Sequence, residues 1–227
     1  MTQPPPSTPV SRSQTARNSL LGVLVIGLLL LGIVGVLSLR QIRNLTTPTP
    51  TVEAIPYGVS PVDPPIAVQD FSLPASSGQS LGLSDLKGKY TLLFFGYTHC
   101  PDYCPTTLAN WKTLKQTLGD NASRLNWIFI SVDGARDTPE VMQRYLSRFD
   151  LAFIGLTGND TVLRKIGTDY GLDYTLHTEE GANYSVDHTT RQYLLDPEAR
   201  IIDEFSFDTA QVDVVKVIQQ EMANPTA

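Results

Sequence analysis

The chain has 227 residues and a net charge of −6, with 41% hydrophobic and 18% charged residues. These proportions are typical of a folded globular protein and argue against a disordered chain. All 23 acidic residues follow residue 43, where 13 Lys and Arg leave a net charge of −10. Because an acidic domain repels polyanions, we expect no nucleic-acid partner. The two cysteines are too few for a scaffold held together by disulfides.

The N-terminal part of the chain is predicted to contain one membrane anchor. Residues 19–39 carry no charge and, as a helix, would reach about 31 Å, roughly one bilayer core. No small-x-small cleavage site follows, so we expect a transmembrane helix in contact with lipid rather than a cleaved signal peptide. Two arginines flank the segment on each side, and the terminal amine favours a short inner tail, residues 1–18, with the C-terminal domain outside.

A proline-rich tether is predicted over residues 40–65. Prolines recur through this stretch among Thr, Ser and Val, which excludes a regular helix and favours an extended chain. The prolines are Pro48, Pro50, Pro56, Pro61, Pro64 and Pro65. The tether would hold the remaining domain, residues 66–227, away from the membrane.

The first half of that domain shows strand and helix patterns in alternation. Residues 66–89 predict short strands joined by a Gly/Ser turn, that is, an N-terminal hairpin. The apolar run 90–97 predicts a buried strand, and the spacing of Leu and Trp over 103–118 predicts a helix. Residues 125–133 predict a second buried strand.

The second half continues the alternation and ends in a hairpin and a helix. Thr138 is expected to cap a helix, and a third strand, a short helix and an inserted loop over 172–190 follow. The segments QYLLD and IIDEFSF flank PEAR as a hairpin, and Asp208 with Gln211 predicts a capping box for the last helix. We therefore predict an α/β fold: a thioredoxin-like central mixed sheet flanked by helices, preceded by one transmembrane helix.

Both cysteines, Cys100 and Cys104, lie in the motif GYTHCPDYCP at the predicted first strand–helix junction. A helix N-terminus favours anions and therefore thiolates. That property serves disulfide exchange, peroxide reduction and metal binding alike. The i, i+4 spacing brings two side chains together on a helix-like turn, and two thiolates suit Cu(I). A metal site would need a third ligand from elsewhere in the chain.

The chain offers three histidines as candidates for that ligand. If the strand extends to His99, the alternation of side chains points its imidazole away from Cys100, and we interpret His99 as a scaffold residue. His177 lies in a polar loop and is expected to be solvated. His188 precedes the strand QYLLD in a loop that should return to the cysteine edge. It is the candidate ligand, although a lone histidine is more often structural.

Two functions that need no metal compete with a metal-binding function. A thiol-disulfide reductase would use one cysteine to attack and one to resolve, and it would not need His188. A peroxidase ranks last, because Tyr97 stands where peroxiredoxins place a Thr three residues before the reactive cysteine. We expect a binding protein rather than an enzyme, with thiol-disulfide exchange as an accessory activity.

Several motifs together resemble those of the Sco/SenC copper chaperones, which assist assembly of the binuclear copper centre of cytochrome c oxidase. The resemblance runs from about Phe71 to Met222. It rests on LKGKYTLLFFGYTHCPDYCPTTL, SVDGARDTPEVMQRYLSRF, IGLTGND, VDHTT and YLLDPEARI. The first of these is highly specific, because the strand, FGYTHCP and the C-x-x-x-C pair occur together.

The resemblance implies a site, partners and a location. Cys100, Cys104 and His188 would bind Cu(I), and also Cu(II). The copper-binding subunit of cytochrome c oxidase would receive the metal, and an upstream donor would supply it. The chain would sit in a bacterial inner membrane with its C-terminal domain facing the periplasm or cell exterior, rather than in a mitochondrial inner membrane.

Three acidic residues stand close to the expected ligands in the sequence and are candidates for a supporting role. Asp102 lies between the cysteines, Asp187 adjoins His188, and Asp133 is expected near the cysteine loop. Carboxylates commonly orient histidine ligands. Two alternatives to a supporting role are equally good: Asp102 as the acid that balances the helix dipole, and Asp187 as an exposed loop residue. In this family we expect a proline after Asp133, and Gly134 in its place is expected to loosen a turn near the site.

Overall fold

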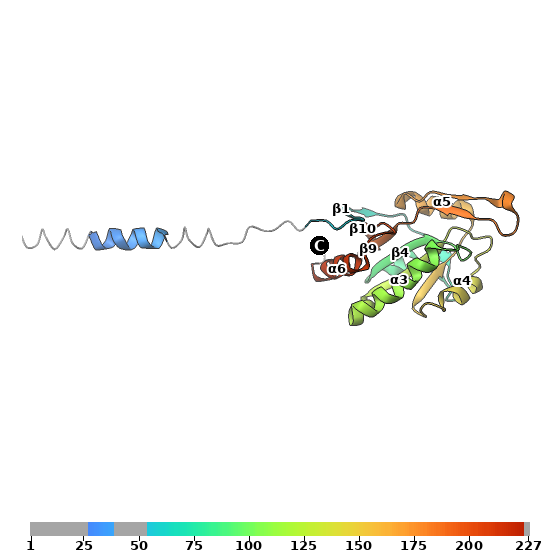
Figure 1. Cartoon of the computed structure of the whole chain (residues 1–227), viewed down its shortest axis with the longest axis horizontal. Helices are drawn as coiled ribbons and strands as arrows, with labels where there is room; N and C mark the ends of the chain where they lie inside the picture. The colour runs from blue at the N-terminus through green and yellow to red at the C-terminus, as the bar shows by residue number, and fades with distance from the viewer. Residues whose placement is uncertain (1–26, 39–53, 225–227) are drawn as a thin grey trace, which may run out of the picture. The chain divides into compact units, whose positions relative to one another are not determined.

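The computed structural model describes residues 27–38 and 54–224 (Figure 1). The chain divides into two compact units, Met1–Ala54 and Ile55–Ala227. In the first unit, residues 27–38 are helical and expose their large apolar side chains. Within the described ranges, no helix has both the length and the apolar character needed to span a bilayer.

Part of the sequence prediction falls outside the described residues. This holds for the tail 1–18, for the flanks of the predicted anchor 19–39, and for residues 40–53 of the predicted tether. The final three residues, 225–227, also lie outside them.

A six-stranded mixed sheet forms the centre of the second unit, in the order β1-β10-β9-β4-β5-β6. Three strands at one side are parallel, and the other three are antiparallel to their neighbours. The strands are β1 (Val59–Ala67), β4 (Tyr90–Gly96), β5 (Leu125–Ser131), β6 (Phe153–Leu156), β9 (Gln192–Leu195) and β10 (Arg200–Phe205). Because β4 is buried along its whole length, it reads as a continuous apolar run.

Helices cover both faces of this sheet, which confirms the thioredoxin-like α/β arrangement predicted for this unit. The helix α3 (Tyr103–Leu118) packs against α6 (Gln211–Ala223), and α4 (Pro139–Leu146) packs on β6. On the other face, Tyr170 follows α5 (Asp160–Gly167) in the short helix η2 (Thr168–Tyr170), and its ring lies 5.2 Å from that of Phe95. Figure 1 shows α3 and α6 beside the strands β4 and β9.

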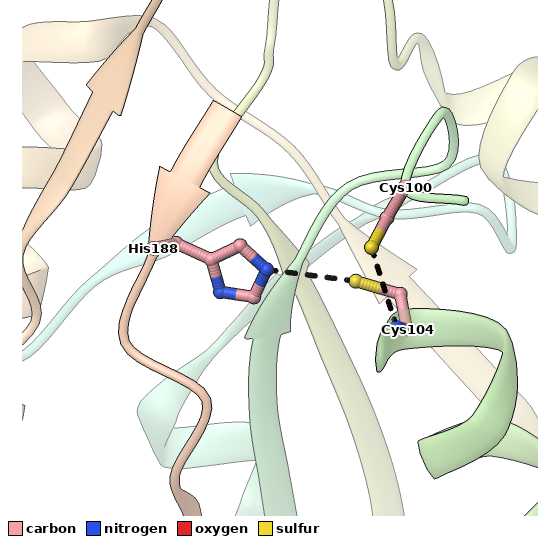
Figure 2. Close-up of side chains that lie close together, drawn as sticks. All are labelled: Cys100, Cys104 and His188. Atoms are coloured by element: carbon pink, nitrogen blue, oxygen red, sulfur yellow. Dashed lines mark hydrogen bonds between the residues drawn. The ribbon is translucent and has the colours of Figure 1, made fainter. Parts of the chain in front are cut away.

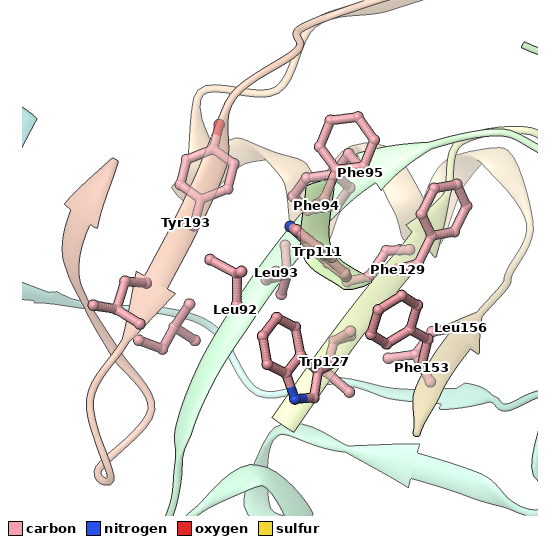
Figure 3. Close-up of a cluster of buried hydrophobic side chains, with 14 of the residues drawn as sticks. Leu92, Leu93, Phe94, Phe95, Trp111, Trp127, Phe129, Phe153, Leu156 and Tyr193 are labelled. Atoms are coloured by element: carbon pink, nitrogen blue, oxygen red, sulfur yellow. The ribbon is translucent and has the colours of Figure 1, made fainter. Parts of the chain in front are cut away.

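Aromatic side chains fill the interface between α3 and the sheet (Figure 3). The ring of Trp111 on α3 lies 5.6 to 6.4 Å from those of Phe94, Trp127 and Phe153. Its indole N–H donates to Gln192 on β9 at 2.6 Å, so the buried polar atom is satisfied. This packing fixes the start of α3 against the end of β4, where the cysteines lie.

Short elements complete the domain. The expected N-terminal hairpin is present as β2 (Ser72–Pro74) and β3 (Ser80–Gly82), followed by α2 (Leu83–Leu86). The short helix η1 (Gly119–Arg124) follows α3. The inserted segment is not a plain loop. It contains an antiparallel pair, β7 (Tyr174–Leu176) and β8 (Val186–His188), with η3 (Thr178–Glu180) between them. We call residues 174–188 the histidine hairpin.

Two sequence predictions differ from the structure. Residues 59–65, assigned to the tether, belong to β1, which pairs with β10 at the sheet edge. An edge strand tolerates prolines because one side needs no ladder hydrogen bonds, and the register shifts between Pro61 and Ile66. The expected capping box is also absent. The N-cap of α6 is Ala210, which makes no side-chain cap, whereas Thr138 caps α4 through the Val141 N–H as predicted.

Candidate metal centre

Three side chains from two distant segments converge at one edge of the sheet (Figure 2). Cys100 lies in the loop after β4, Cys104 is the second residue of α3, and His188 ends β8. Their sulfur and nitrogen ligand atoms all lie within 4.8 Å of one another. The Cys104 thiol is 3.6 Å from His188 Nε2, although the two residues are 84 positions apart.

The local sequence makes room for this cluster. A Cβ atom at Gly96 would lie 2.7 Å from Cys104 Sγ and 2.9 Å from the Phe129 ring, so only glycine fits at the end of β4. Cys104 is fully buried beneath the loop, and Cys100 is half-buried. The backbone N–H of Cys104 points at Cys100 Sγ at 3.5 Å, as expected for an anion at a helix N-terminus.

The two thiols differ strongly in acidity. A hydrogen bond from the Cys104 side chain lowers the pKa of Cys100 to about 3, and bonds from the backbone N–H groups of Cys104 and Asp102 add to the effect. Burial, followed by the hydrogen bond to Cys100 and the charge on that sulfur, raises the pKa of Cys104 well above its ordinary value. Cys100 is therefore a thiolate at neutral pH, and the cluster holds one negative charge before any metal binds.

The imidazole of His188 is oriented by its surroundings. Its Nδ1 donates to the carbonyl oxygen of Thr189 at 2.8 Å, so Nε2 presents a lone pair toward the two sulfurs. The rings of Phe94 and Tyr97 lie 6.0 and 5.9 Å away in edge-on arrangements. The Tyr97 hydroxyl also accepts the Val186 N–H of β8 at 3.3 Å. This geometry suits ligation through Nε2.

Asp137 supports the cysteine loop, and sequence reasoning missed it. Its buried carboxylate accepts the Thr98 N–H at 2.9 Å, the Thr98 hydroxyl at 2.5 Å and the Ser131 hydroxyl at 2.6 Å. Thr98 is two residues before Cys100, so Asp137 fixes the start of the loop. The acid stands in the quoted motif SVDGARDTP, but nothing in a single sequence shows which backbone it contacts.

The three acidic residues proposed as supports lie in different surroundings. The Asp102 backbone N–H bonds the Cys100 sulfur, while its side chain makes no cap on α3. Asp187 points into solvent, 83% exposed, and binds His177 Nε2 at 2.9 Å, which raises the pKa of His177. Asp133 is buried and bonds Arg136 instead of a ligand.

Gly134 differs from expectation, while His99 lies outside the cluster of Cys100, Cys104 and His188. His99 is 48% exposed and lies 3.7 Å from Asp137. Together with Asp133 these residues form a second cluster. The carboxylates of Asp133 and Asp137 already accept hydrogen bonds from other residues. Gly134 does not loosen its turn. A Cβ there would overlap the carbonyl oxygen of Gly158, so glycine permits a close approach between two backbones.

The fold and the cluster define a class of protein: a thioredoxin-fold domain with two cysteines and one histidine converging at the strand–helix junction. Comparison with known proteins gives the family. The family model SCO1/SenC matches residues 60–223, and the chain belongs to that family. An SCO2-like protein of Rickettsia felis is 31% identical over 152 residues, 66% of this chain and 74% of that protein.

Solved structures agree in fold and in family. ScoI of Bradyrhizobium japonicum, solved with copper bound, is 37% identical with a TM-score of 0.62, covering 67% of this chain and 98% of that one. Apo Sco1 of Thermus thermophilus is 36% identical with a TM-score of 0.66, covering 74% of this chain and 98% of that one.

Proposed function

We propose that this chain is a membrane-anchored copper chaperone. Cys100, Cys104 and His188 bind one copper ion, as Cu(I) and also as Cu(II), and deliver it to the binuclear copper centre of cytochrome c oxidase. One observation carries the proposal: two thiols and an imidazole lone pair converge within 4.8 Å from segments far apart in sequence. Membership of the SCO1/SenC family and the copper-bound relative support it.

The chemistry of the three groups fits copper better than harder metals. Thiolate and imidazole ligands favour soft and borderline ions, and Cu(I) accepts three ligands. Cys100 is already ionised, so metal binding must displace only the proton of Cys104. Cys100 and His188 are partly exposed, so an acceptor's ligands could approach there and exchange with them one at a time.

The proposed location follows from the N-terminal sequence. The uncharged residues 19–39, of which 27–38 form a helix with exposed apolar side chains, would anchor the chain in a bacterial inner membrane. The domain would then face the periplasm or cell exterior, where it would meet the copper-binding subunit of the oxidase and an upstream copper donor.

Cu(I) competition with a chelator tests the copper site. The reduced full chain should bind one Cu(I), and His188→Ala should weaken binding by about 10- to 100-fold. The matched control is His177→Ala, which removes a histidine from the same hairpin that lies outside the cluster. Absence of tight copper binding in the unmodified chain, or equal affinity in the two variants, would contradict the proposal.

A thiol-disulfide reductase is the second candidate, favoured by the unequal acidity of the two cysteines. The Cys100 thiolate would attack a partner disulfide and form a mixed disulfide, releasing one partner thiolate. Deprotonated Cys104 would then attack Cys100 Sγ, releasing the second thiolate and leaving a Cys100–Cys104 disulfide. Rapid exchange with a model disulfide that His188→Ala leaves unchanged would favour this function.

A further inference from the structure

The histidine hairpin is fastened to the domain by a closed set of contacts around Arg136. Asp133 accepts Arg136 Nε at 2.5 Å through one carboxylate oxygen and the Tyr184 hydroxyl at 2.5 Å through the other. Arg136 Nη1 donates to the Tyr184 carbonyl oxygen at 2.8 Å. The guanidinium also stacks 3.4 Å from the centre of the Tyr184 ring. We call these three residues the inner clamp.

The same arrangement occurs a second time, around Tyr174 on strand β7 of the hairpin. Asp160 accepts Arg164 Nε at 2.9 Å and the Tyr174 hydroxyl at 2.7 Å. Arg164 Nη1 donates to the Tyr174 carbonyl oxygen at 3.3 Å, and its guanidinium lies 4.2 Å from the ring centre. Asp160, Arg164 and Tyr174 form the outer clamp, with the same connections as the inner one.

The two clamps differ in burial. In the inner clamp, the side chains of Arg136 and Asp133 are 14% and 0% exposed. In the outer clamp, those of Arg164 and Asp160 are 49% and 56% exposed. Water and salt screen the outer pair, whereas the inner contacts act in a low-dielectric environment and are worth more. The inner clamp should therefore hold the hairpin much more strongly.

Both clamps act close to His188. Tyr174 is the cross-strand partner of His188, and Tyr184 lies four residues before it. Between Tyr184 and His188, Val186 donates its N–H to Tyr97, whose ring also lies 5.9 Å from the Arg136 guanidinium. Arg136 thus lies against both Tyr97, which bonds β8 through Val186, and Tyr184, which precedes β8.

We propose that the inner clamp positions His188, and that Arg136 is the positioning residue on which the third copper ligand depends. Arg136 touches neither sulfur nor imidazole and acts through Tyr184 and β8. Its planar guanidinium makes the ion pair, the carbonyl bond and the ring stack at once, which a lysine could not do. The inference that Arg136 docks the hairpin does not depend on copper binding. The inferred effect of Arg136 on copper affinity rests on the proposed function.

The first test measures docking in the copper-free, reduced full chain by amide hydrogen exchange. Arg136→Gln should reduce the protection of the Val186 and Thr189 amides by about tenfold or more, while the amides of β9 and β10 keep theirs. Arg164→Gln is the matched control with the same connections and should change protection by less than about threefold. Tyr184→Phe, a milder change that keeps the ring, should have an intermediate effect.

The second test measures copper through the histidine. Arg136→Gln should weaken Cu(I) binding by about 10- to 100-fold, as loss of a ligand-orienting group does. In a His188→Ala background the same change should have almost no further effect on Cu(I) affinity, because Arg136 influences copper binding only by positioning His188. A merely structural role for Arg136 would give additive losses.

The outcomes separate this inference from the proposed function. If the unmodified chain binds no copper, the function fails, and hydrogen exchange still decides whether the clamp docks the hairpin. Unchanged hairpin protection in Arg136→Gln would overturn the inference, as would equal losses in Arg136→Gln and Arg164→Gln. Loss of protection together with a non-additive copper effect would support it.

Discussion

A buried carboxylate on β10 should make the stability of the domain depend on pH. Asp203 is 3% exposed, and its Oδ2 finds no hydrogen-bond partner in the described part of the chain. Its cross-strand neighbour on β1 is Pro61, whose side chain offers no hydrogen-bond donor. Burial, with a smaller contribution from Glu221, raises the pKa of Asp203 from 3.8 to about 7.

The sign of the effect follows from proton binding. Between about pH 4 and 7 the folded state keeps the Asp203 proton and the unfolded state loses it, so the free energy of unfolding falls as pH rises. A pKa difference of this size corresponds to about 4 kcal/mol, of which most should be lost by pH 8. Asp203→Asn cannot ionise and should not show this loss.

Denaturant unfolding of both proteins between pH 4.5 and 8 measures the effect. At the acid end the two should have similar free energies of unfolding, and at pH 8 the variant should be more stable by roughly 2 to 4 kcal/mol. Glu221→Gln serves as a control and should recover only a small part of the difference. Parallel pH profiles for the unmodified chain and Asp203→Asn would refute the reasoning.

Three further predictions concern the thiols and the packing around them. Iodoacetamide should modify Cys100 before Cys104, at a rate nearly constant from pH 5 to 8, because the pKa of Cys100 is about 3; a rate rising tenfold per pH unit would contradict this. Gln192→Leu leaves the buried Trp111 N–H without an acceptor and should cost roughly 1 to 3 kcal/mol in denaturant unfolding. Gly134→Ala should destabilise the domain by about 1 to 3 kcal/mol, and an unchanged unfolding midpoint would refute the close backbone approach.

The sequence predicted those strands and helices whose apolar spacing matches the burial of their side chains in the folded domain. The apolar run of β4 and the Leu/Trp spacing of α3 gave the strand–helix junction, so both cysteines were placed correctly. By contrast, β1 escaped detection because its prolines are typical of a tether, and only pairing with β10 makes it a strand.

Sequence reasoning anticipated which three side chains converge in the cluster, but not the residues that support them. A C-x-x-x-C pair near a helix start and one histidine in a returning loop are visible in the residue order. Asp137 and Arg136 act through tertiary contacts, with Thr98 and with Tyr184, that no local periodicity encodes. The same limit explains why the sequence left open whether Asp187, adjacent to His188, supports that histidine or lies in solvent, where the structure places it. In a strand, neighbouring side chains point to opposite faces, and Asp187 meets His177.

X-ray absorption at the copper edge of the Cu(I)-loaded, reduced full chain identifies the atoms that bind copper and so tests the three-ligand site. We expect two sulfur ligands and one nitrogen ligand per copper, from Cys100, Cys104 and His188. His188→Ala should remove the nitrogen contribution, while His177→Ala should leave the spectrum unchanged. A sulfur-only environment in the unmodified chain, or a nitrogen contribution that survives in His188→Ala, would contradict the three-ligand site.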